Sequence, residues 1–344
     1  MQLTNPNKMI GEGKTSPLFD DRLLVAGLFI ICLVVWGKNA FYGQAYGMLV
    51  IAISMLAIMA GDIFISLFGI YCACWFTYFL SSHYSGLIPA SDIIQTMDTM
   101  FLIVGGLIIY VGVKYGKTSK ETWFNAICIV TSIIVIIGLI QYYYNQPARA
   151  TLGNQNFLGA FIAICAICFL RAKWWTWLLL PIILIGLYST HCATAIIALI
   201  VGLCYLAWGW KGVAISTIPG LLYILLFKGF GSLINRAGYW TDAFDKLSNH
   251  WYLMLFGTGP GILWQYGNML HSEISYLLWN FGIIGLILYI GYIIASCRRV
   301  SDRQLFAIFL VIIVDGISNH LMHVASTAYL ALVFLALKDR PLEV

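Results

Sequence analysis

Charged residues are scarce in this chain. Only 10% of its 344 residues are Asp, Glu, Lys or Arg, whereas 61% are hydrophobic, and the mean hydropathy is +0.88. Soluble domains carry roughly 25% charged residues, so this composition excludes an ordinary soluble domain. Most of the chain is therefore expected to contact lipid.

Three further patterns are absent. Residues 1–21 lack the basic-then-apolar order of a cleaved signal peptide, so the first apolar segment is expected to remain as an anchor. The apolar runs are continuous rather than short and alternating, which excludes an outer-membrane barrel. Most of the nine cysteines lie inside apolar runs, where a thiol acts as a small hydrophobic group, so neither a structural disulfide nor a zinc site is expected.

The apolar segments predict an all-α polytopic membrane protein with about twelve transmembrane helices in one integral membrane domain, residues 1–344. A spanning helix needs ~20 mostly apolar residues, and fewer if its ends are aromatic. The expected spans are 22–37, 45–61, 63–81, 97–114, 122–142, 155–171, 173–189, 191–209, 212–229, 273–296, 303–316 and 322–338.

The basic residues predict the orientation of these spans. With a cytoplasmic amino terminus, the inner side holds fourteen Lys and Arg and the outer side five, which are Lys38, Arg149, Lys228, Arg236 and Lys246. Cytoplasmic loops of membrane proteins carry such an excess, so both termini are expected in the cytoplasm. The histidines then lie on or near the outer face: His83, His191, His250, His271, His320 and His323.

The longest hydrophilic stretch, residues 229–272, is expected to form an external loop between the ninth and tenth spans. Its segment Gly257-Thr-Gly-Pro-Gly261 predicts a tight turn that returns the chain to His271. This turn lacks the lysine and the spacing of a phosphate loop, so we expect no nucleotide site. Nucleic acid is likewise not an expected partner.

His271 and Glu273 stand directly before a long apolar segment. Imidazole and carboxylate groups are costly to bury in lipid, so both are expected at a membrane surface or in a polar cavity. An imidazole titrates near neutrality and can transfer a proton during catalysis. The alternative interpretation is that His271 only marks where the helix leaves the bilayer.

Three segments follow one another in a characteristic order. They are Thr151-Leu-Gly-Asn-Gln-Asn-Phe-Leu-Gly-Ala160, Arg236-Ala-Gly-Tyr-Trp240 followed by Gly257-Thr-Gly-Pro-Gly261, and His271-Ser-Glu273 followed by Gly282-Ile-Ile-Gly285. In this order the chain resembles the O-antigen ligase and O-antigen polymerase superfamily. The resemblance covers residues 145–295, and the first four spans match only in hydropathy.

The resemblance implies a fold of the membrane-embedded glycosyltransferase type, in the bacterial inner membrane, with a periplasmic active site. Such enzymes transfer a glycan from undecaprenyl pyrophosphate to a lipid or glycan acceptor. It implies an O-antigen ligase of lipopolysaccharide biosynthesis that attaches the glycan to a sugar hydroxyl of lipid A-core, with inversion. A polymerase that joins repeat units on the same carrier is the alternative, and a secondary transporter or an assembly scaffold are rivals from other classes.

The resemblance also assigns the catalytic residues. His271 is placed as the base or the acceptor-orienting residue, with Glu273 positioning it or binding sugar. Arg149 and Arg236 are the candidates for the pyrophosphate, because a guanidinium group pairs bidentately with phosphate oxygens. No metal ion and no other cofactor is therefore expected.

Further residues have a predicted binding role and a structural alternative. Asn154 and Asn156 contact the donor or only cap a helix. Tyr276 stacks on a sugar or belongs to the interfacial aromatic belt. Arg149 binds phosphate or extends to lipid headgroups. His191 stands where the family often has the arginine of Ser-Arg-Gly, so it would bind phosphate only when protonated.

Overall fold

The computed structural model describes the larger part of the chain. The described residues are 52–53, 55–57, 59–84, 90–152, 154–170, 172–223, 238, 240–241, 244–245, 247–258, 272–299, 302–317, 319 and 325–339. Within these residues every regular element is a helix, which confirms the all-α class. The predicted span 22–37, and part of the span 45–61, lie outside the described residues.

A helix lies in each of the ten predicted spans from 63–81 onward. The α-helices are α3 (Ile63–Tyr84), α4 (Ala90–Tyr115), α5 (Lys120–Tyr143), α6 (Gln155–Ala166), α7 (Leu180–Ser189), α8 (Ala193–Trp208), α9 (Trp210–Tyr223), α12 (Glu273–Arg299), α13 (Arg303–Gly316) and α14 (Ala325–Asp339). Two short 3-10 helices, η2 (Ile167–Leu170) and η3 (Trp174–Leu179), follow α6 and precede α7. Among the described residues of the predicted external loop lies the short helix α11 (Trp251–Phe256), which packs on α12.

Side-chain caps define where several of these helices begin. The Ser119 hydroxyl accepts a hydrogen bond from the amide of Thr122 at the start of α5 (3.1 Å). At the start of α13, Asp302 Oδ1 accepts from the amides of Gln304 and Leu305 (3.0 and 3.2 Å). Such caps satisfy amides that have no partner within the helix.

In the part of the chain that the structure describes, two helices are long and apolar enough to cross a membrane, Lys120–Tyr143 and the Glu273–Ala295 part of α12. Other apolar helices are shorter than this, among them Gln155–Leu170 and Ala193–Trp208. The count of twelve spans therefore stays a prediction.

One face of α5 exposes a row of isoleucines. Ile129, Ile133, Ile136 and Ile140 are between 46% and 54% exposed, and their spacing places them along one side of the helix. The opposite side is buried, for example at Phe124 and Val135. An apolar surface of this length marks contact with lipid or with a partner.

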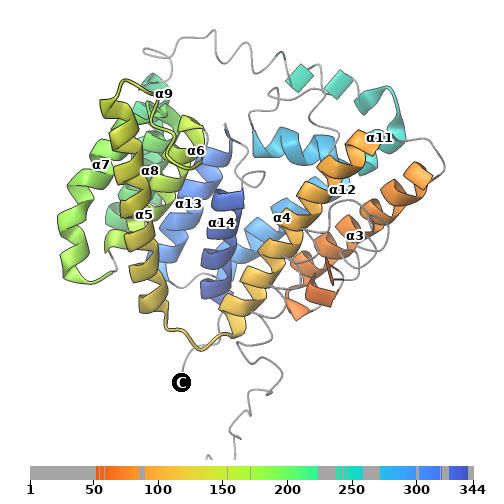
Figure 1. The fold of residues 1–344 in the computed structure, drawn as a ribbon, viewed down its shortest axis with the longest axis horizontal. Helices are drawn as coiled ribbons and strands as arrows, with labels where there is room; N and C mark the ends of the chain where they lie inside the picture. The colour runs from red at the N-terminus through yellow and green to blue at the C-terminus, as the bar shows by residue number, and fades with distance from the viewer. Residues whose placement is uncertain are drawn as a thin grey trace, which may run out of the picture.

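The helices form two groups joined through α13 and α14. One group holds α5 to α9, with α8 packed against α13, and the other holds α3, α4, α11 and α12, with α4 packed against α14 (Figure 1). Helices α8 and α13 run antiparallel, because Asn319 contacts Thr194 at one end and Arg303 contacts the carbonyl of Tyr205 at the other.

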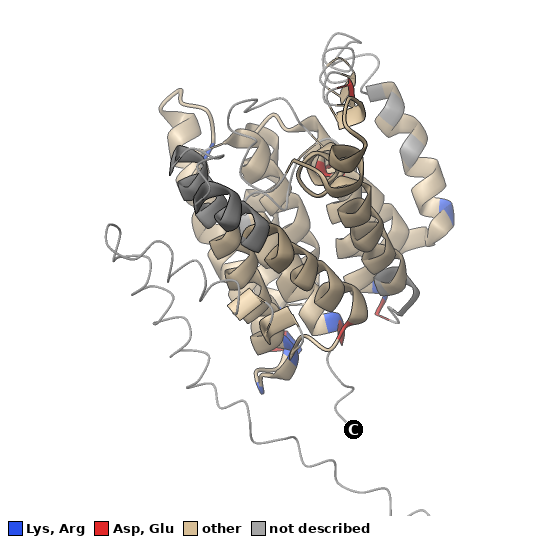
Figure 2. Ribbon diagram, turned by 90° about the vertical axis from the view of Figure 1, so that its right-hand side faces the viewer, with Lys and Arg blue, Asp and Glu red and all other residues tan. Residues whose placement is uncertain are grey.

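The basic residues gather at one end of the bundle. Lys173 bonds through its amide to Asn125, near the start of α5, and Arg303 contacts the last turns of α8. Lys338 is buried near the end of α14, where Tyr110 of α4 bonds to Asp339. Figure 2 shows Lys and Arg mostly towards this lower end of the helices. We call it the basic end and the opposite one, which holds the start of α8 and the end of α13, the polar end.

Candidate functional site

Six helix ends meet at the polar end. The end of α5 packs on the start of α6, because a Cβ on Gly138 would lie 3.0 Å from Leu158. The start of α6 contacts the α7–α8 turn, and the start of α8 bonds to Asn319 beyond α13. The start of α12 joins them, because a Cβ on Gly316 would lie 3.7 Å from Glu273 Cβ.

The turn from Thr190 to Thr194 holds His191 in an unusual conformation. His191 has φ of 52°, in the left-handed region that residues other than glycine rarely adopt. Thr190 stabilises the turn, since its hydroxyl donates to the carbonyl of Leu187 (2.7 Å) and accepts from the amide of Cys192 (3.3 Å). The imidazole is exposed and lies between two tyrosine rings, with centroids 6.0 Å from both Tyr142 and Tyr188.

Gly159 allows this turn to approach α6 closely. A Cβ at position 159 would lie 2.6 Å from Cys192 Cβ and 2.9 Å from the Thr190 hydroxyl. The glycine of the Thr151–Ala160 segment is therefore required by packing. It brings the His191 turn against α6, the helix that Asn154 caps.

Gln141 fixes the loop that carries Arg149. Its Oε1 accepts hydrogen bonds from the amides of Arg149 (3.0 Å) and Ala150 (2.7 Å), and its Nε2 donates to the Ala150 carbonyl (3.3 Å). The residue Arg149 is itself exposed. Its backbone is thus held at the polar end while its side chain faces outward, which suits either phosphate binding or contact with headgroups.

Asn154 is the N-cap of α6, and Asn156 supplies the amide that it caps. Asn154 Oδ1 accepts from the amide of Asn156 (2.8 Å) at the start of α6. Asn154 is exposed and Asn156 is half-buried. A contact of either residue with a donor remains a prediction.

Two carboxylates lie buried where α12 begins and α13 ends. Glu273 is 3% exposed and Asp315 is fully buried. Asn319 Nδ2 donates to Asp315 Oδ1 (2.9 Å) and to the Thr194 hydroxyl (3.0 Å), and Thr194 contacts Cys192 Sγ (3.4 Å). A continuous row of polar groups therefore runs from the His191 turn, through Thr194 and Asn319, to Asp315, which directly precedes Gly316, the residue that lies near Glu273.

Glu273 is the first residue of α12, where the amide dipoles of a helix attract negative charge. Burying a carboxylate in apolar surroundings costs free energy unless such compensation is present. A buried acid at the end of an apolar bundle is a candidate for function rather than for stability.

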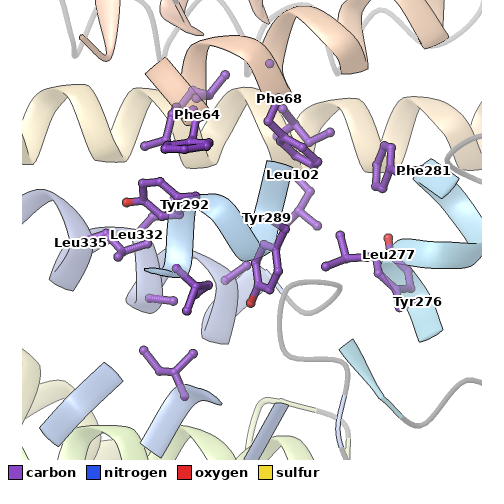
Figure 3. A pocket seen from close by; sticks show the side chains of 18 of the residues that line it. Phe64, Phe68, Leu102, Tyr276, Leu277, Phe281, Tyr289, Tyr292, Leu332 and Leu335 are labelled. Atoms are coloured by element: carbon purple, nitrogen blue, oxygen red, sulfur yellow. The ribbon is translucent and has the colours of Figure 1, made fainter. Parts of the chain in front are cut away.

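An apolar cavity of about 150 Å³ lies between α3, α4, α12, α13 and α14. Its wall carries mostly aromatic and aliphatic groups, including Phe64, Phe68, Tyr289 and Tyr292 (Figure 3). Tyr276, one turn after Glu273, also lines the cavity and is 5% exposed. The ring of Tyr276 is thus packed in the core, and its predicted contact with a sugar remains a prediction.

The structure brings several predicted site residues to the polar end: Arg149, Asn154, Asn156, His191 and Glu273. His271 and Arg236 lie outside the described residues, as do His320 and His323. Among the residues that the structure describes, no group of three His, Cys, Asp or Glu is placed to hold a metal ion.

Sequence reasoning did not assign a role to Gln141, Thr194, Asp315 or Asn319. A usable signal existed for two of them, because Asp315 and Asn319 stand four residues apart at the end of an apolar helix and therefore share one face. The partners of Gln141 and Thr194 are distant in sequence or belong to a loop, and no local pattern indicates them.

No family model, curated protein or solved structure matches this chain. A function for the polar end is therefore inferred from its own residues.

Proposed function

We propose that this protein is a membrane-embedded glycosyltransferase that moves a glycan from a polyprenyl pyrophosphate to a sugar hydroxyl of a lipid-linked acceptor. It would act as an O-antigen ligase at the periplasmic face of the bacterial inner membrane, with both termini in the cytoplasm. The observation that supports the proposal is that Arg149, His191 and Glu273 all lie at the polar end, opposite the basic end. In an inner-membrane protein, the basic end faces the cytoplasm.

These residues suit the transfer. The acceptor oxygen attacks the anomeric carbon while the bond from that carbon to the pyrophosphate oxygen breaks, and the pyrophosphate leaves with the electron pair. Arg149, together with Arg236, is assigned to the growing negative charge, and His191 adds a donor when protonated. The hydroxyl proton passes to His271, oriented by Glu273, and the attack inverts the anomeric centre.

The apolar cavity beside the start of α12 supports a lipid-linked substrate. Its lining of Phe64, Phe68 and other hydrophobic groups matches a hydrocarbon segment and offers little to a free sugar. A lipid carrier would thus find apolar and polar surfaces within one or two turns of α12.

Deleting the gene tests this proposal. We expect undecorated lipid core and an accumulation of long polyprenyl-linked chains. Complementation with Arg149→Lys should restore part of the decoration and Arg149→Ala less, because lysine keeps the charge but loses the bidentate pairing. Core that carries a single repeat unit would instead establish a polymerase, and unchanged envelope glycans would refute glycan transfer altogether.

Removal of divalent cations provides a second prediction. We expect purified protein to transfer glycan at an unchanged rate in excess EDTA, because guanidinium groups are assigned to the charge that a metal ion would otherwise neutralise. The rate is measured with and without added Mg²⁺ or Mn²⁺. Strict dependence on either ion would contradict the assignment of Arg149 and Arg236.

A secondary transporter is the second candidate, and two observations favour it. Asp315 and Glu273 are buried carboxylates within an apolar bundle, and α12 is interrupted at Gly282, which has φ of 63° and ψ of −167°. Transporters place ionisable groups and broken helices beside their substrates. Solute uptake driven by a proton or sodium gradient in proteoliposomes, with normal envelope glycans in the deletion strain, would establish this function.

A further inference from the structure

We propose that Asp315, Asn319 and Thr194 form a positioning device that fixes the His191 turn for the pyrophosphate of the donor. This inference rests on the proposed function and assigns to it three residues for which the sequence indicated no role. Its hydrogen bonds link the end of α13 to the start of α8. They thereby connect Asp315 with the turn that carries His191.

The hydrogen bonds give the Asn319 amide a single orientation. Its Nδ2 donates one bond to Asp315 Oδ1 (2.9 Å) and one to the Thr194 hydroxyl (3.0 Å). Asp315 is fully buried and Asn319 is 4% exposed, so water does not compete for these groups. The NH₂ of Asn319 has two protons and supplies both bonds, so it faces Asp315 and Thr194 while the amide oxygen points away from them.

The fixed orientation of the Asn319 amide also constrains the turn that carries His191. Because Thr194 accepts from Asn319, its own proton is left for Cys192 Sγ at 3.4 Å. Cys192 directly follows His191, whose φ of 52° is a conformation that relaxes easily once its supports are removed. Thr190 supports the turn from the α7 side, and the Asn319–Thr194 bond supports it from the α8 side.

The test compares variants of the full chain in detergent, with inorganic pyrophosphate as the probe in calorimetry. Thr194→Val, which replaces the hydroxyl by a methyl group of similar size, should weaken pyrophosphate binding by about 3- to 10-fold, the value of one hydrogen bond. Thr194→Ser keeps the hydroxyl and should bind as the unaltered protein does. In glycan transfer, Thr194→Val should raise the donor KM and leave kcat nearly unchanged.

An exchange of the residues at positions 315 and 319 separates positioning from a need for charge at position 315. Asp315→Asn alone leaves only a neutral amide oxygen to accept from Asn319, which is a weaker acceptor than a carboxylate, and should weaken binding. In the double variant with Asn319→Asp, the new amide donates to the new carboxylate, which accepts from Thr194. Thr194 then accepts from the Cys192 thiol, so the connection is restored with its direction reversed. We expect binding within about 3-fold of the unaltered protein. Failure of the exchange to restore binding, with Thr194→Val also binding normally, would overturn the proposal.

Alkylation of Cys192, followed by peptide mass spectrometry, reports on the turn without any ligand. Cys192 is 3% exposed, so its labelling requires the turn to open. Thr194→Val should speed this labelling several-fold, and Thr194→Ser should not. Equal rates in both variants would overturn the positioning device. Faster labelling of a protein that neither binds pyrophosphate nor transfers glycan would instead refute the proposed function and leave the device in place.

Discussion

Gly282→Ala is expected to destabilise the protein by about 2–5 kcal/mol, from backbone strain and overlap together. Gly282 has φ of 63° and ψ of −167°, a region that is almost restricted to glycine. A Cβ there would overlap the carbonyl oxygen of Leu255 and lie 2.5 Å from the amide nitrogen of Gly257. Thermal unfolding of the purified protein in detergent measures the loss.

Gly209→Ala is the matched control for Gly282→Ala. Gly209 also has a positive φ, of 64°, but a Cβ there would meet only the guanidinium of Arg303, at 3.6 Å. Gly209→Ala therefore introduces backbone strain without steric overlap. The melting temperature of this variant should fall less than that of Gly282→Ala. Equal falls in melting temperature in the two variants would show that overlap with the backbone of Leu255 and Gly257 does not add to the destabilisation by Gly282→Ala.

Glu273→Gln is expected to lower kcat for glycan transfer by about 100-fold or more, the usual effect of losing a group that takes part in proton transfer. Glutamine has nearly the same shape, so the packing around α12 should persist. The neutral amide, however, no longer supports a positively charged base. Steady-state kinetics with the lipid-linked donor measure the effect, and the donor KM should change little.

Glu121→Gln is the control for Glu273→Gln. Glu121 also lies in the first turn of a long apolar helix, but it is exposed and belongs to the basic end. Its loss should leave kcat within about 2-fold of the unaltered value, since exposed charges contribute little. A normal kcat for Glu273→Gln, in protein that is folded by thermal unfolding, would remove Glu273 from the proposed machinery.

The sequence predicted the helices well because each apolar run is long and is bounded by polar residues. Lys120–Tyr143 and Arg303–Gly316 match the predicted spans 122–142 and 303–316 within two residues. The separation of basic from polar ends was likewise predictable, because it depends only on the order of helices and loops. The number of membrane crossings is less accessible, since hydropathy alone does not distinguish a short span from a buried helix.

The candidate site was predictable only in part. Arg149 and His191 stand in connections between helices and Glu273 begins a helix, and the alternation of helices brings them to one side. The contacts of Asp315 with Asn319, and of Asn319 with Thr194, depend on how α13 lies against α8. Packing between helices distant in sequence is set by the shapes of many side chains, and no short pattern encodes it.

The isoleucine row of α5 has a consequence for how copies of this protein meet. Branching at Cβ leaves isoleucine one strongly preferred rotamer in a helix, so the ridge formed by Ile129, Ile133, Ile136 and Ile140 is stiff. Acyl chains solvate such a ridge as well as another protein does, so within a bilayer it supplies no drive towards dimerisation. When lipid and detergent are removed, the same ridge is exposed to water and associates with apolar surfaces of other copies. Aggregation of the protein should begin there.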